Sequence, residues 1–367
     1  MNKSYYSLGL MSGTSLDGVD ASIILSDGEK KLDIIDNYYE KYDNNFKFSL
    51  KDFINRTTSP EYIKNKKDLY RKLENQLTTN HAKVSKEIIN KNKDIRIDFV
   101  GFHGQTILHK PNKGISIQMG DPNLLSQLLK KKIYFNFRQN DILNGGEGAP
   151  LTPIYHYQIF KKIKLELPII FLNIGGIANI SYININEKIT SFDVGPGNCL
   201  IDQWICQNIN KDFDRDGLIA ESGKIDNSIL NQAIDDHMYL KSNRKSFDIK
   251  NFDTSFVRRL TLENGAATLT AYTAHIIAEG INKINENKIP IILCGGGRKN
   301  KFLLKNISKH TKYNLINIDN FGINGDYVES QAFAYLAIRS YLKKYISFPS
   351  TTGVKLPVTG GEMFENF

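Results

Sequence analysis

The chain has 367 residues, of which 41% are hydrophobic and 24% are charged, a balance that excludes wholesale disorder, a collagen-like repeat and a membrane channel. At about 100–200 residues per domain, this length predicts two or three domains. The formal net charge of +9 is compatible with an anionic partner, but we interpret most of the excess as solvated surface lysine because the basic residues are scattered along the chain.

The first forty residues predict a β-meander. An aromatic and apolar strand at residues 5–11 runs into a turn rich in glycine and hydroxyl side chains, and a second strand follows at 19–25. Asp27 and Gly28 then indicate a hairpin turn before a third apolar segment at 32–39.

Helical spacing dominates residues 46–93, and a buried-type strand follows at 97–102. Asp121 and Pro122 predict the start of a helix, because an Asp side chain accepts the first N–H groups and a Pro fits the first turn. A short strand at 133–137 precedes a loop-rich segment, residues 140–153, which is the best candidate for a domain boundary.

The second half repeats this layout: a meander whose first strand runs into a glycine-rich turn, and then helices alternating with strands. Its expected strands are 168–173, 177–184, 189–193 and 290–294, and its expected helices are 199–209, most of 226–286 (including 266–284) and 328–344. We therefore predict two α/β halves with a ligand cleft between them.

Four glycine-rich turns follow strands, at residues 12–18, 173–176, 193–198 and 295–297. Glycine at a strand end lets backbone N–H groups approach an anion closely. One such turn is usually a simple tight connection, but four in one chain favour an anionic ligand.

Two common nucleotide motifs are missing from the sequence. The only Gly-Lys pair, Gly223-Lys224, is followed by Ile225 where a P-loop needs Ser or Thr, and a partial Rossmann pattern fails at Leu200. A nucleotide, if bound, must be held by a different scaffold.

Carboxylates flank these turns at Asp17, Asp20, Asp193 and Asp202. An Asp beside a phosphate-binding turn repels the phosphate unless it meets Mg²⁺ or acts as a base. Local turn caps are the alternative explanation for Asp17 and Asp20. Asp193, at a strand end next to glycines, is the stronger catalytic candidate.

Polar residues after the strand at 97–102 suit a polyol or amide substrate. His103, Gln105 and Thr106 offer imidazole, amide and hydroxyl groups, although a packed loop histidine would explain the first of them. Arg138 lies shortly before Asp141 and suits a bidentate contact with a carboxylate or phosphate, with an ordinary salt bridge as the alternative.

The cysteines and the N-terminal residues point to the cytoplasm. Cys199, Cys206 and Cys294 show no CxxC spacing and read as reduced thiols. The N-terminal residues have no signal-peptide pattern, and no stretch approaches the ~20 apolar residues of a membrane span.

Several of these motifs together resemble one family, the anhydro-N-acetylmuramic acid kinases, over nearly the whole chain. The segments that carry the resemblance are residues 12–20 (SGTSLDGVD), 104–106 (GQT), 137–141 (FRQND), 146–151 (GEGAPL), 173–179 (NIGGIAN), 192–198 (FDVGPGN), 214–217 (DRDG) and 294–297 (CGGG).

The resemblance implies a two-lobed α/β fold of the actin, hexokinase and Hsp70 class, with duplicated topology and ATP in the cleft between the lobes. The N-terminal lobe would comprise residues 1–139 and about 335–367, with the C-terminal helix packing back on it, and the C-terminal lobe residues 140–334. The implied protein is a cytoplasmic homodimer with no nucleic-acid or membrane partner.

The implied reaction opens 1,6-anhydro-N-acetylmuramic acid with water and ATP, giving N-acetylmuramic acid 6-phosphate and ADP, in peptidoglycan recycling and amino-sugar catabolism. The resemblance makes Asp193 the base that takes the proton of water and Glu329 a second carboxylate that orients the water. A first-turn Glu that merely suits the helix dipole remains the alternative for Glu329. Gln105, Thr106 and Arg138 would contact the sugar.

The cofactors implied are ATP and Mg²⁺. The expected nucleotide contacts are Gly13, Thr14, Ser15, Leu16, Asp17, Gly18, Val19, Asp20, Gly175, Gly176, Gly195, Gly197, Asn198, Gly295, Gly296 and Gly297. Mg²⁺ would bridge the phosphates, with Asp17 as a water-mediated partner.

Three other functions stay open at this point. A simple amino-sugar kinase of the same fold would phosphorylate a free hydroxyl without opening a ring. A chaperone or filament ATPase of this fold would need a peptide-binding or polymer surface, and we find no appended domain for it. A nucleic-acid-binding protein is suggested by charge alone and lacks a recognised motif.

Overall fold

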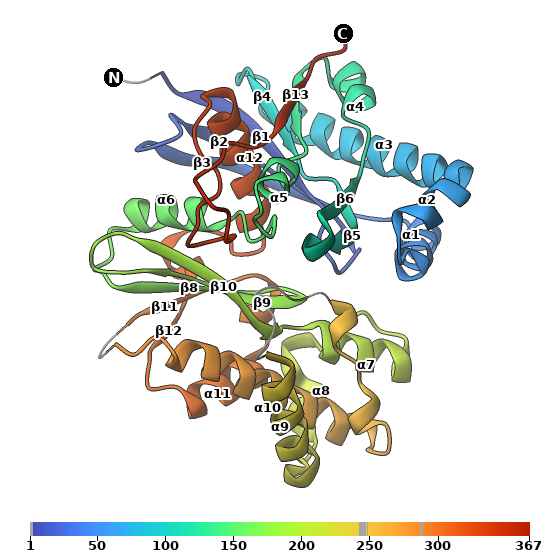
Figure 1. The fold of residues 1–367 in the computed structure, drawn as a ribbon, viewed down its shortest axis with the longest axis vertical. Coiled ribbons are helices and arrows are strands. Elements are labelled where there is room, and N and C mark those ends of the chain that lie inside the picture. Colours follow the sequence, from blue (N-terminus) through green and yellow to red (C-terminus); the bar gives the residue numbers. More distant parts are fainter. Residues whose placement is uncertain (1–2, 242–246, 248, 287–288) are drawn as a thin grey trace. The chain divides into compact units, whose positions relative to one another are not determined.

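The computed structural model describes residues 3–241, 247, 249–286 and 289–367, and the chain divides into two compact units (Figure 1). Unit 1 comprises the residues up to Lys164 together with Tyr327–Phe367, and unit 2 comprises Leu165–Asp326. Residues 140–164 and 327–334, which we expected in the second lobe, thus belong to unit 1.

The segment after residue 140 joins unit 1 through its helix, α6 (Pro153–Ile163). The Tyr155 hydroxyl donates to Oε1 of Gln331 (2.9 Å), and Nζ of Lys162, which follows in the chain, donates to the carbonyl oxygen of Leu32 (3.0 Å). Gln331 and Leu32 both lie in unit 1, so the chain first passes from unit 1 to unit 2 after α6 and not before it.

Unit 1 is built on a six-stranded sheet in the order β13-β7-β4-β1-β2-β3. The predicted meander is confirmed, because the first three strands pair antiparallel. β4 then pairs parallel with β1, and β7 pairs parallel with β4. The bounds are β1 Tyr5–Met11, β2 Gly18–Ser26, β3 Leu32–Lys41, β4 Phe99–Phe102, β7 Lys132–Phe135 and β13 Glu362–Phe364.

Unit 2 has a five-stranded sheet in the order β10-β9-β8-β11-β12. β8, β9 and β10 again form an antiparallel meander. β11 pairs parallel with β8, and β12 pairs parallel with β11. Both units therefore share strand order and direction, which confirms the predicted duplicated topology. The bounds are β8 Ile169–Ile174, β9 Ile177–Ile183, β10 Ile189–Pro196, β11 Ile291–Cys294 and β12 Leu315–Asn317.

Helices cover both faces of the sheet in unit 1. Apolar side chains of α1, α3 and α4 pack on the face that carries Leu8 and Leu10, while α12 lies on the other face (Figure 1). The predicted cap is confirmed, since the Asp121 carboxylate accepts the N–H groups of Asn123 and Leu124 (2.9 and 3.0 Å). The bounds are α1 Asn44–Arg56, α2 Pro60–Asn65, α3 Lys67–Lys91, α4 Pro122–Leu129 and α12 Val328–Tyr341.

Two glycines bring α12 unusually close to the sheet. Gly9 and Gly101 are register partners on β1 and β4. A Cβ at Gly9 would lie 1.9 Å from the carbonyl oxygen of Ser330, and one at Gly101 would lie 2.1 Å from that of Phe333. Only glycine fits at this distance, so these two positions fix α12 on the sheet.

Unit 2 has two apolar clusters that share the long helix α10. Its C-terminal half packs with α11 on the sheet, and its N-terminal half packs with α7, α8 and α9. Residues 242–246 and 248 of the predicted helical stretch lie outside the described residues. The bounds are α7 Cys199–Ile209, α8 Leu218–Ser222, α9 Asn227–Lys241, α10 Leu262–Asn282 and α11 Lys301–His310.

Some short elements depart from our predictions. The hairpin of β5 (Gln105–Lys110) and β6 (Ile115–Met119) was not predicted, and α5 (Gln139–Leu143) lies in the expected loop. The tail, which lacks periodicity, contributes β13 to the edge of the sheet beside β7. Within the described part of the chain, no helix is long and apolar enough to cross a bilayer.

The turn between β2 and β3 predicts a pH effect on stability. The buried Asp27 carboxylate accepts N–H bonds from Glu29, Lys30 and Lys31 (2.7–2.9 Å). Burial alone would raise the pKa of Asp27, but these bonds outweigh it and lower the pKa below its ordinary value. A lowered pKa in the folded state stabilises the fold above the unfolded-state pKa, and this stabilisation is lost as the pH falls.

We therefore expect Asp27→Asn to destabilise the protein by about 1–2 kcal/mol at pH 7. Urea unfolding of wild type and variant between pH 7 and pH 3 measures the effect. The difference should shrink as the pH drops below about 4, the unfolded-state pKa of Asp. A difference that does not change with pH would contradict this account of the turn.

Candidate active site

In unit 1 the candidate residues gather at one edge of the sheet. β1, β4 and β7 run parallel, so their carboxyl ends meet there and are followed by residues 12–18, 103–106 and 136–138. Ligands of open α/β sheets bind outside the carboxyl ends of strands. This edge is therefore the candidate site of unit 1.

The loop after β1 has an exposed tip and anchored ends. Thr14 and Ser15 are exposed, whereas the Leu16 side chain is buried in the apolar core although its φ is +55°. The Ser15 hydroxyl donates to the Asp17 carboxylate (2.6 Å), and the Asp17 carbonyl oxygen accepts the backbone N–H of Tyr42 (2.9 Å). The tip is thus open to solvent, while its Leu16 anchor is internal.

Of the remaining expected contacts in this loop, Gly18 and Val19 are buried, and Gly13 and Asp20 are half-buried. A Cβ at Gly18 would lie 2.3 Å from the carbonyl oxygen of Glu40. Packing therefore explains the glycine at position 18, and a direct ligand contact is best supported for residues 13–15.

Gln105 links this loop to the neighbouring one. Its Oε1 accepts the Ser12 hydroxyl (2.7 Å), and that hydroxyl oxygen in turn accepts the Tyr42 hydroxyl (2.9 Å). Burial is the main cause that raises the pKa of Tyr42, so this side chain stays neutral and donates. The described contacts of Gln105 are internal, and its predicted sugar contact stays a prediction.

Thr106 and Arg138 lie on the same edge. The half-buried Thr106 hydroxyl accepts a hydrogen bond from Nε2 of Gln118 (3.2 Å). Arg138 donates from Nη2 to Nε2 of His103 (3.0 Å) and from Nη1 to the carbonyl oxygen of Gly148 (3.0 Å). Arg138 therefore joins the loops after β4 and β7.

Asp141 is a structural residue in this segment. Its buried carboxylate accepts the backbone N–H of Gly148 (2.6 Å) and the hydroxyl of Thr352. A Cβ at Gly146 would lie 2.1 Å from the Asp141 carboxylate. Gly146 and Gly148 of the motif at 146–151 thus lie against one carboxylate, which the spacing from Arg138 did not reveal.

Glu329 lies in the first turn of α12 and is half-buried. Its neighbours fix that turn: Oγ of Ser330 lies 2.6 Å from Oγ of Ser22, and Gln331 donates to Oδ1 of Asn37 (3.0 Å). The position of Glu329 is therefore well defined within unit 1, and its catalytic role stays a prediction.

In unit 2 three of the four glycine-rich turns meet at one edge. β8, β10 and β11 point the same way, so their carboxyl ends lie together. Gly197 N–H donates to the Gly176 carbonyl oxygen (2.9 Å) and Asn198 N–H to that of Gly175 (2.8 Å). A Cβ at Gly295 would lie 2.5 Å from Oδ1 of Asn173.

We call these three turns, residues 173–176, 193–198 and 295–297, the cradle of unit 2. The cradle has no room for side chains at its base but is open at its rim. A Cβ at Gly197 would lie 2.2 Å from the Gly175 carbonyl oxygen, whereas one at Gly296 would meet no atom within 4 Å. Gly195, with φ of +155°, follows the bulge in β10. Gly195 and Gly197 are buried, Gly175, Gly176 and Gly295 are half-buried, and Gly296 is exposed. Glycine backbone at such a rim suits an anion such as a phosphate group.

Asp193 lies in β10 beside that bulge and in register with Asn179, which is in register with Asn173. The residues next to these three in the sequence point into the apolar core under α10 and α11. Because side chains alternate between the faces of a strand, Asp193, Asn179 and Asn173 share the opposite face of the sheet. Oδ2 of Asp193 accepts the backbone N–H of Phe247 (3.0 Å). Among the described residues, buried Oδ1 of Asn179 has no partner.

The sequence analysis missed the ion-pair network that anchors the glycine turn after β11. The buried guanidinium of Arg298 binds the carboxylates of Asp319 (3.1 Å) and Asp326 (2.5 Å), and it donates to the carbonyl oxygen of Gly295 (3.0 Å). Burial opposes ionisation of Asp326, but the bonds from Arg298 and Lys299 outweigh it and lower its pKa.

We expect Arg298→Met to lower the free energy of unfolding of unit 2 by about 2–4 kcal/mol, because it removes one member of a buried charge network. Urea unfolding measures this change. Lys305→Met is the matched control, since it removes only an exposed pair with Glu221. Equal stability of the two variants would contradict the anchoring role.

The segment at 214–217 has a structural explanation. The buried Asp214 carboxylate accepts N–H bonds from Ile219 and Ala220 (both 2.9 Å), so it caps α8. Gly217 has φ of +78°, and a Cβ there would lie 2.2 Å from Oδ1 of Asn300. This motif therefore shapes unit 2 rather than presenting a reactive group.

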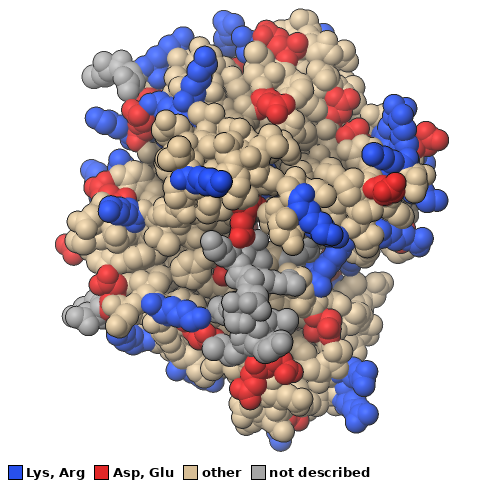
Figure 2. Space-filling model, viewed as in Figure 1, with Lys and Arg blue, Asp and Glu red and all other residues tan. Residues whose placement is uncertain are grey.

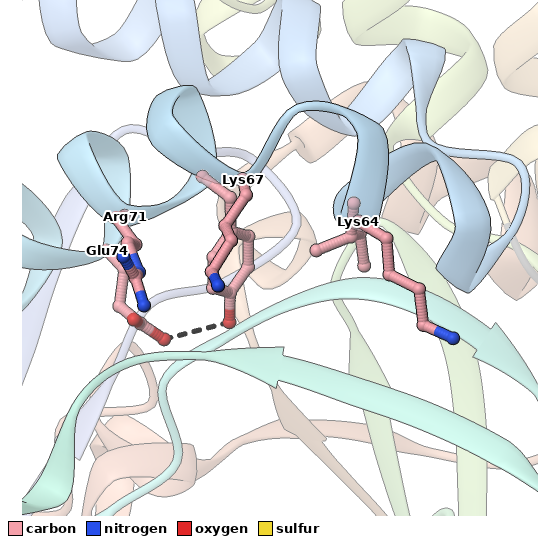
Figure 3. A pocket seen from close by; sticks show the side chains of 6 residues that line it. Lys64, Lys67, Arg71 and Glu74 are labelled. Carbon is pink, nitrogen blue, oxygen red and sulfur yellow. Dashed lines mark hydrogen bonds between the residues drawn. The ribbon is translucent and has the colours of Figure 1, made fainter.

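One pocket of the described residues lies away from these edges. A pocket of about 510 Å³ between α2 and α3 is lined by Lys64, Lys67, Arg71 and Glu74, among others, and contains none of the predicted site residues (Figure 3). On the face shown in Figure 2, Lys and Arg are dispersed among acidic residues. No cluster of three or more metal-binding side chains occurs in the described ranges.

Comparisons with known proteins agree with the segments described above. Residues 5–366 match the family described as anhydro-N-acetylmuramic acid kinase. A protein of that name from Pelagibacter ubique is 50% identical over 100% of both chains. Another, from Zymomonas mobilis, is 38% identical over 97% of this chain and 98% of its own.

The solved structures that match are more distant in sequence. An activator of 2-hydroxyisocaproyl-CoA dehydratase from Clostridium difficile is 14% identical, with a TM-score of 0.44 over 91% of this chain and 94% of its own. A ROK family glucokinase from Streptomyces griseus is 12% identical, with a TM-score of 0.41 over 90% and 99%. From the full-length match to its sequence relatives, the chain belongs to the anhydro-N-acetylmuramic acid kinase family.

Proposed function

We propose that this protein opens 1,6-anhydro-N-acetylmuramic acid with water and phosphorylates O6 at the expense of ATP, giving N-acetylmuramic acid 6-phosphate and ADP. The observation that carries the proposal is the family match over residues 5–366, which includes every candidate segment. We assign the product to peptidoglycan recycling and amino-sugar catabolism, and we propose a cytoplasmic homodimer. Light scattering after size exclusion tests the dimer.

The proposed reaction breaks the bond between C1 and O6. Water adds its oxygen to C1 and gives up a proton, while O6 takes the γ-phosphoryl group of ATP. Attack by an activated water at C1 is the chemistry of an inverting glycosidase. Here the phosphoryl group accepts the leaving oxygen, which is the task of the general acid in that enzyme class.

We propose Asp193 as the base. Its carboxylate is oriented by the N–H of Phe247 and lies on a polar row with Asn179 and Asn173, at a strand end next to the glycine cradle. Glu329 would orient the water, and Thr106 and Arg138 would bind the sugar. A fixed carboxylate supports proton transfer better than a mobile one, because geometry limits such catalysis.

The two backbone surfaces fit the phosphates of ATP. The tip at residues 13–15, exposed at Thr14 and Ser15, and the rim of the cradle at Gly175, Gly295 and Gly296 offer main chain without obstructing side chains. Mg²⁺ neutralises phosphate charge when it is bound. We propose that Asp17 would contact this ion through a water molecule.

The test is incubation with ATP, Mg²⁺ and 1,6-anhydro-N-acetylmuramic acid in ¹⁸O-water. We expect the label on the C1 oxygen of the product and phosphate on O6, by mass spectrometry of fragments. Phosphate transfer without C1 labelling would establish the simple amino-sugar kinase instead. ATP hydrolysis that ignores the sugar would point to an ATPase of another role.

A further inference from the structure

A buried histidine that the proposed chemistry does not use lies beside Arg138. His103 is 3% exposed and directly follows β4. Its ring packs on the ring of Phe333 in α12, with centroids 4.5 Å apart. The side chain is therefore held in one orientation, and its two nitrogens face different partners.

Those partners define the tautomer of His103. Nδ1 lies 2.8 Å from the carbonyl oxygen of Gly104, which can only accept, so Nδ1 carries a proton. Nε2 faces Nη2 and Nε of Arg138 at 3.0 and 3.3 Å, which can only donate, so Nε2 has a lone pair. One species satisfies both contacts: the neutral imidazole with its proton on Nδ1.

The surroundings keep this imidazole neutral. Burial is the main cause that lowers the pKa of His103 well below its ordinary value, and the Arg138 cation lowers it further. A second proton, on Nε2, would make the buried ring a cation about 3 Å from the guanidinium of Arg138. His103 therefore acts as a permanent acceptor for the guanidinium.

A second contact fixes the plane of that guanidinium. Nη1 of Arg138 donates to the Gly148 carbonyl oxygen (3.0 Å), and Gly148 is itself held by the Asp141 carboxylate (2.6 Å). An arginine side chain has about 2 kcal/mol of rotamer entropy, and a guanidinium held in advance loses less of it on binding.

We propose that His103 is a positioning residue: its neutral imidazole holds the Arg138 guanidinium in the orientation that receives the carboxylate of the lactyl group of the sugar substrate. This inference depends on the proposed function, because that function supplies the carboxylate. It assigns to His103 no proton transfer and no direct contact with substrate.

Two variants of His103 separate positioning from packing. His103→Phe keeps a ring against Phe333 but has no acceptor, and His103→Gln has an amide oxygen that can reach the place of Nε2. We expect the Phe variant to raise the KM for the anhydro sugar about 10- to 100-fold with little change in kcat, as for loss of a charged hydrogen bond. The Gln variant should restore most of the binding, and the KM for ATP should stay within about twofold of wild type.

A double-mutant cycle tests whether His103 acts through Arg138. The expected loss with His103→Phe should vanish in an Arg138→Ala background, since there is no guanidinium left to position. Additive losses would contradict the proposal, and so would equal KM values in wild type and His103→Phe. A wild-type enzyme that does not turn over the anhydro sugar would instead contradict the proposed function itself.

A spectroscopic measurement covers the case in which the Phe variant does not fold. In wild-type protein labelled with ¹⁵N-histidine, the resonances lost in His103→Gln identify His103. We expect the shifts of a neutral imidazole protonated on Nδ1, without change between pH 5.5 and pH 8.5. Protonation on Nε2, or a titration within this range, would overturn the assignment.

Discussion

Asp193→Asn should lower turnover of the anhydro sugar by about 10²–10⁴-fold, the usual contribution of a general base. Asparagine keeps an oxygen that can accept the N–H of Phe247, so the local backbone should be preserved. It has no basic oxygen for the proton of water, so the loss should fall on kcat. Steady-state kinetics with coupled detection of ADP measures this change.

Nucleotide affinity provides the internal control for this variant. We expect the Kd for ATP, by calorimetry, to change little, because the phosphates are bound by backbone in the proposed site. Asp235→Asn, on the exposed surface of α9, is the matched substitution and should be fully active. Near-normal turnover by Asp193→Asn would remove this residue from the role of base.

Gly197→Ala should impair ATP binding by distorting the cradle of unit 2. The added Cβ would lie 2.2 Å from the Gly175 carbonyl oxygen, so one of the two turns has to move. Overpacking of this kind costs about 1–3 kcal/mol, and since 1.4 kcal/mol is tenfold, the KM for ATP should rise about 5- to 140-fold if the whole cost falls on binding. Competition with a fluorescent nucleotide measures the affinity directly.

Gly322→Asn is the matched control for a glycine substitution in unit 2. Its φ is +71°, which Asn tolerates, and a Cβ there would meet no atom within 4 Å. It should leave ATP binding unchanged. If Gly197→Ala bound ATP as tightly as this control, the contact between the two turns would have no part in nucleotide binding.

Local sequence signals predicted the elements whose causes are local. The bounds 5–11 for β1 and 199–209 for α7 agree with the structure, because an apolar run ended by a glycine-rich turn marks a strand and a glycine turn before a helix marks its start. The Asp121 cap is also a local effect. Two meanders in one chain made the duplicated topology predictable from order alone.

Elements that depend on distant partners could not be predicted in this way. β13 has three residues and pairs with β7, whose sequence lies more than 220 residues earlier, as in the pair Glu362 and Phe135. The hairpin β5–β6 begins within a motif that we had interpreted as a loop. Short strands carry too little periodicity to be recognised without knowledge of their partners.

The candidate site shows the same division. The glycine turns and Asp193 could be singled out because their residue types are informative by themselves. Arg298 could not, because its partners Asp319 and Asp326 lie 21 and 28 residues away, and nothing local indicates that an arginine there is buried. The bond between Ser12 and Gln105, 93 residues apart, follows only from the parallel register of β1 and β4.

The close seating of α12 on Gly9 and Gly101 bears on the order in which the protein can fold during synthesis. Unit 2 is one continuous stretch, Leu165–Asp326, and can fold as soon as it leaves the ribosome. Unit 1 cannot, because α12 and β13 are translated after the whole of unit 2. Until then its sheet lacks the helix that covers one face, and Glu329 and the ring that packs on His103 do not yet exist. A nascent chain therefore gains its cradle of glycine turns first, and its proposed sugar site is completed last.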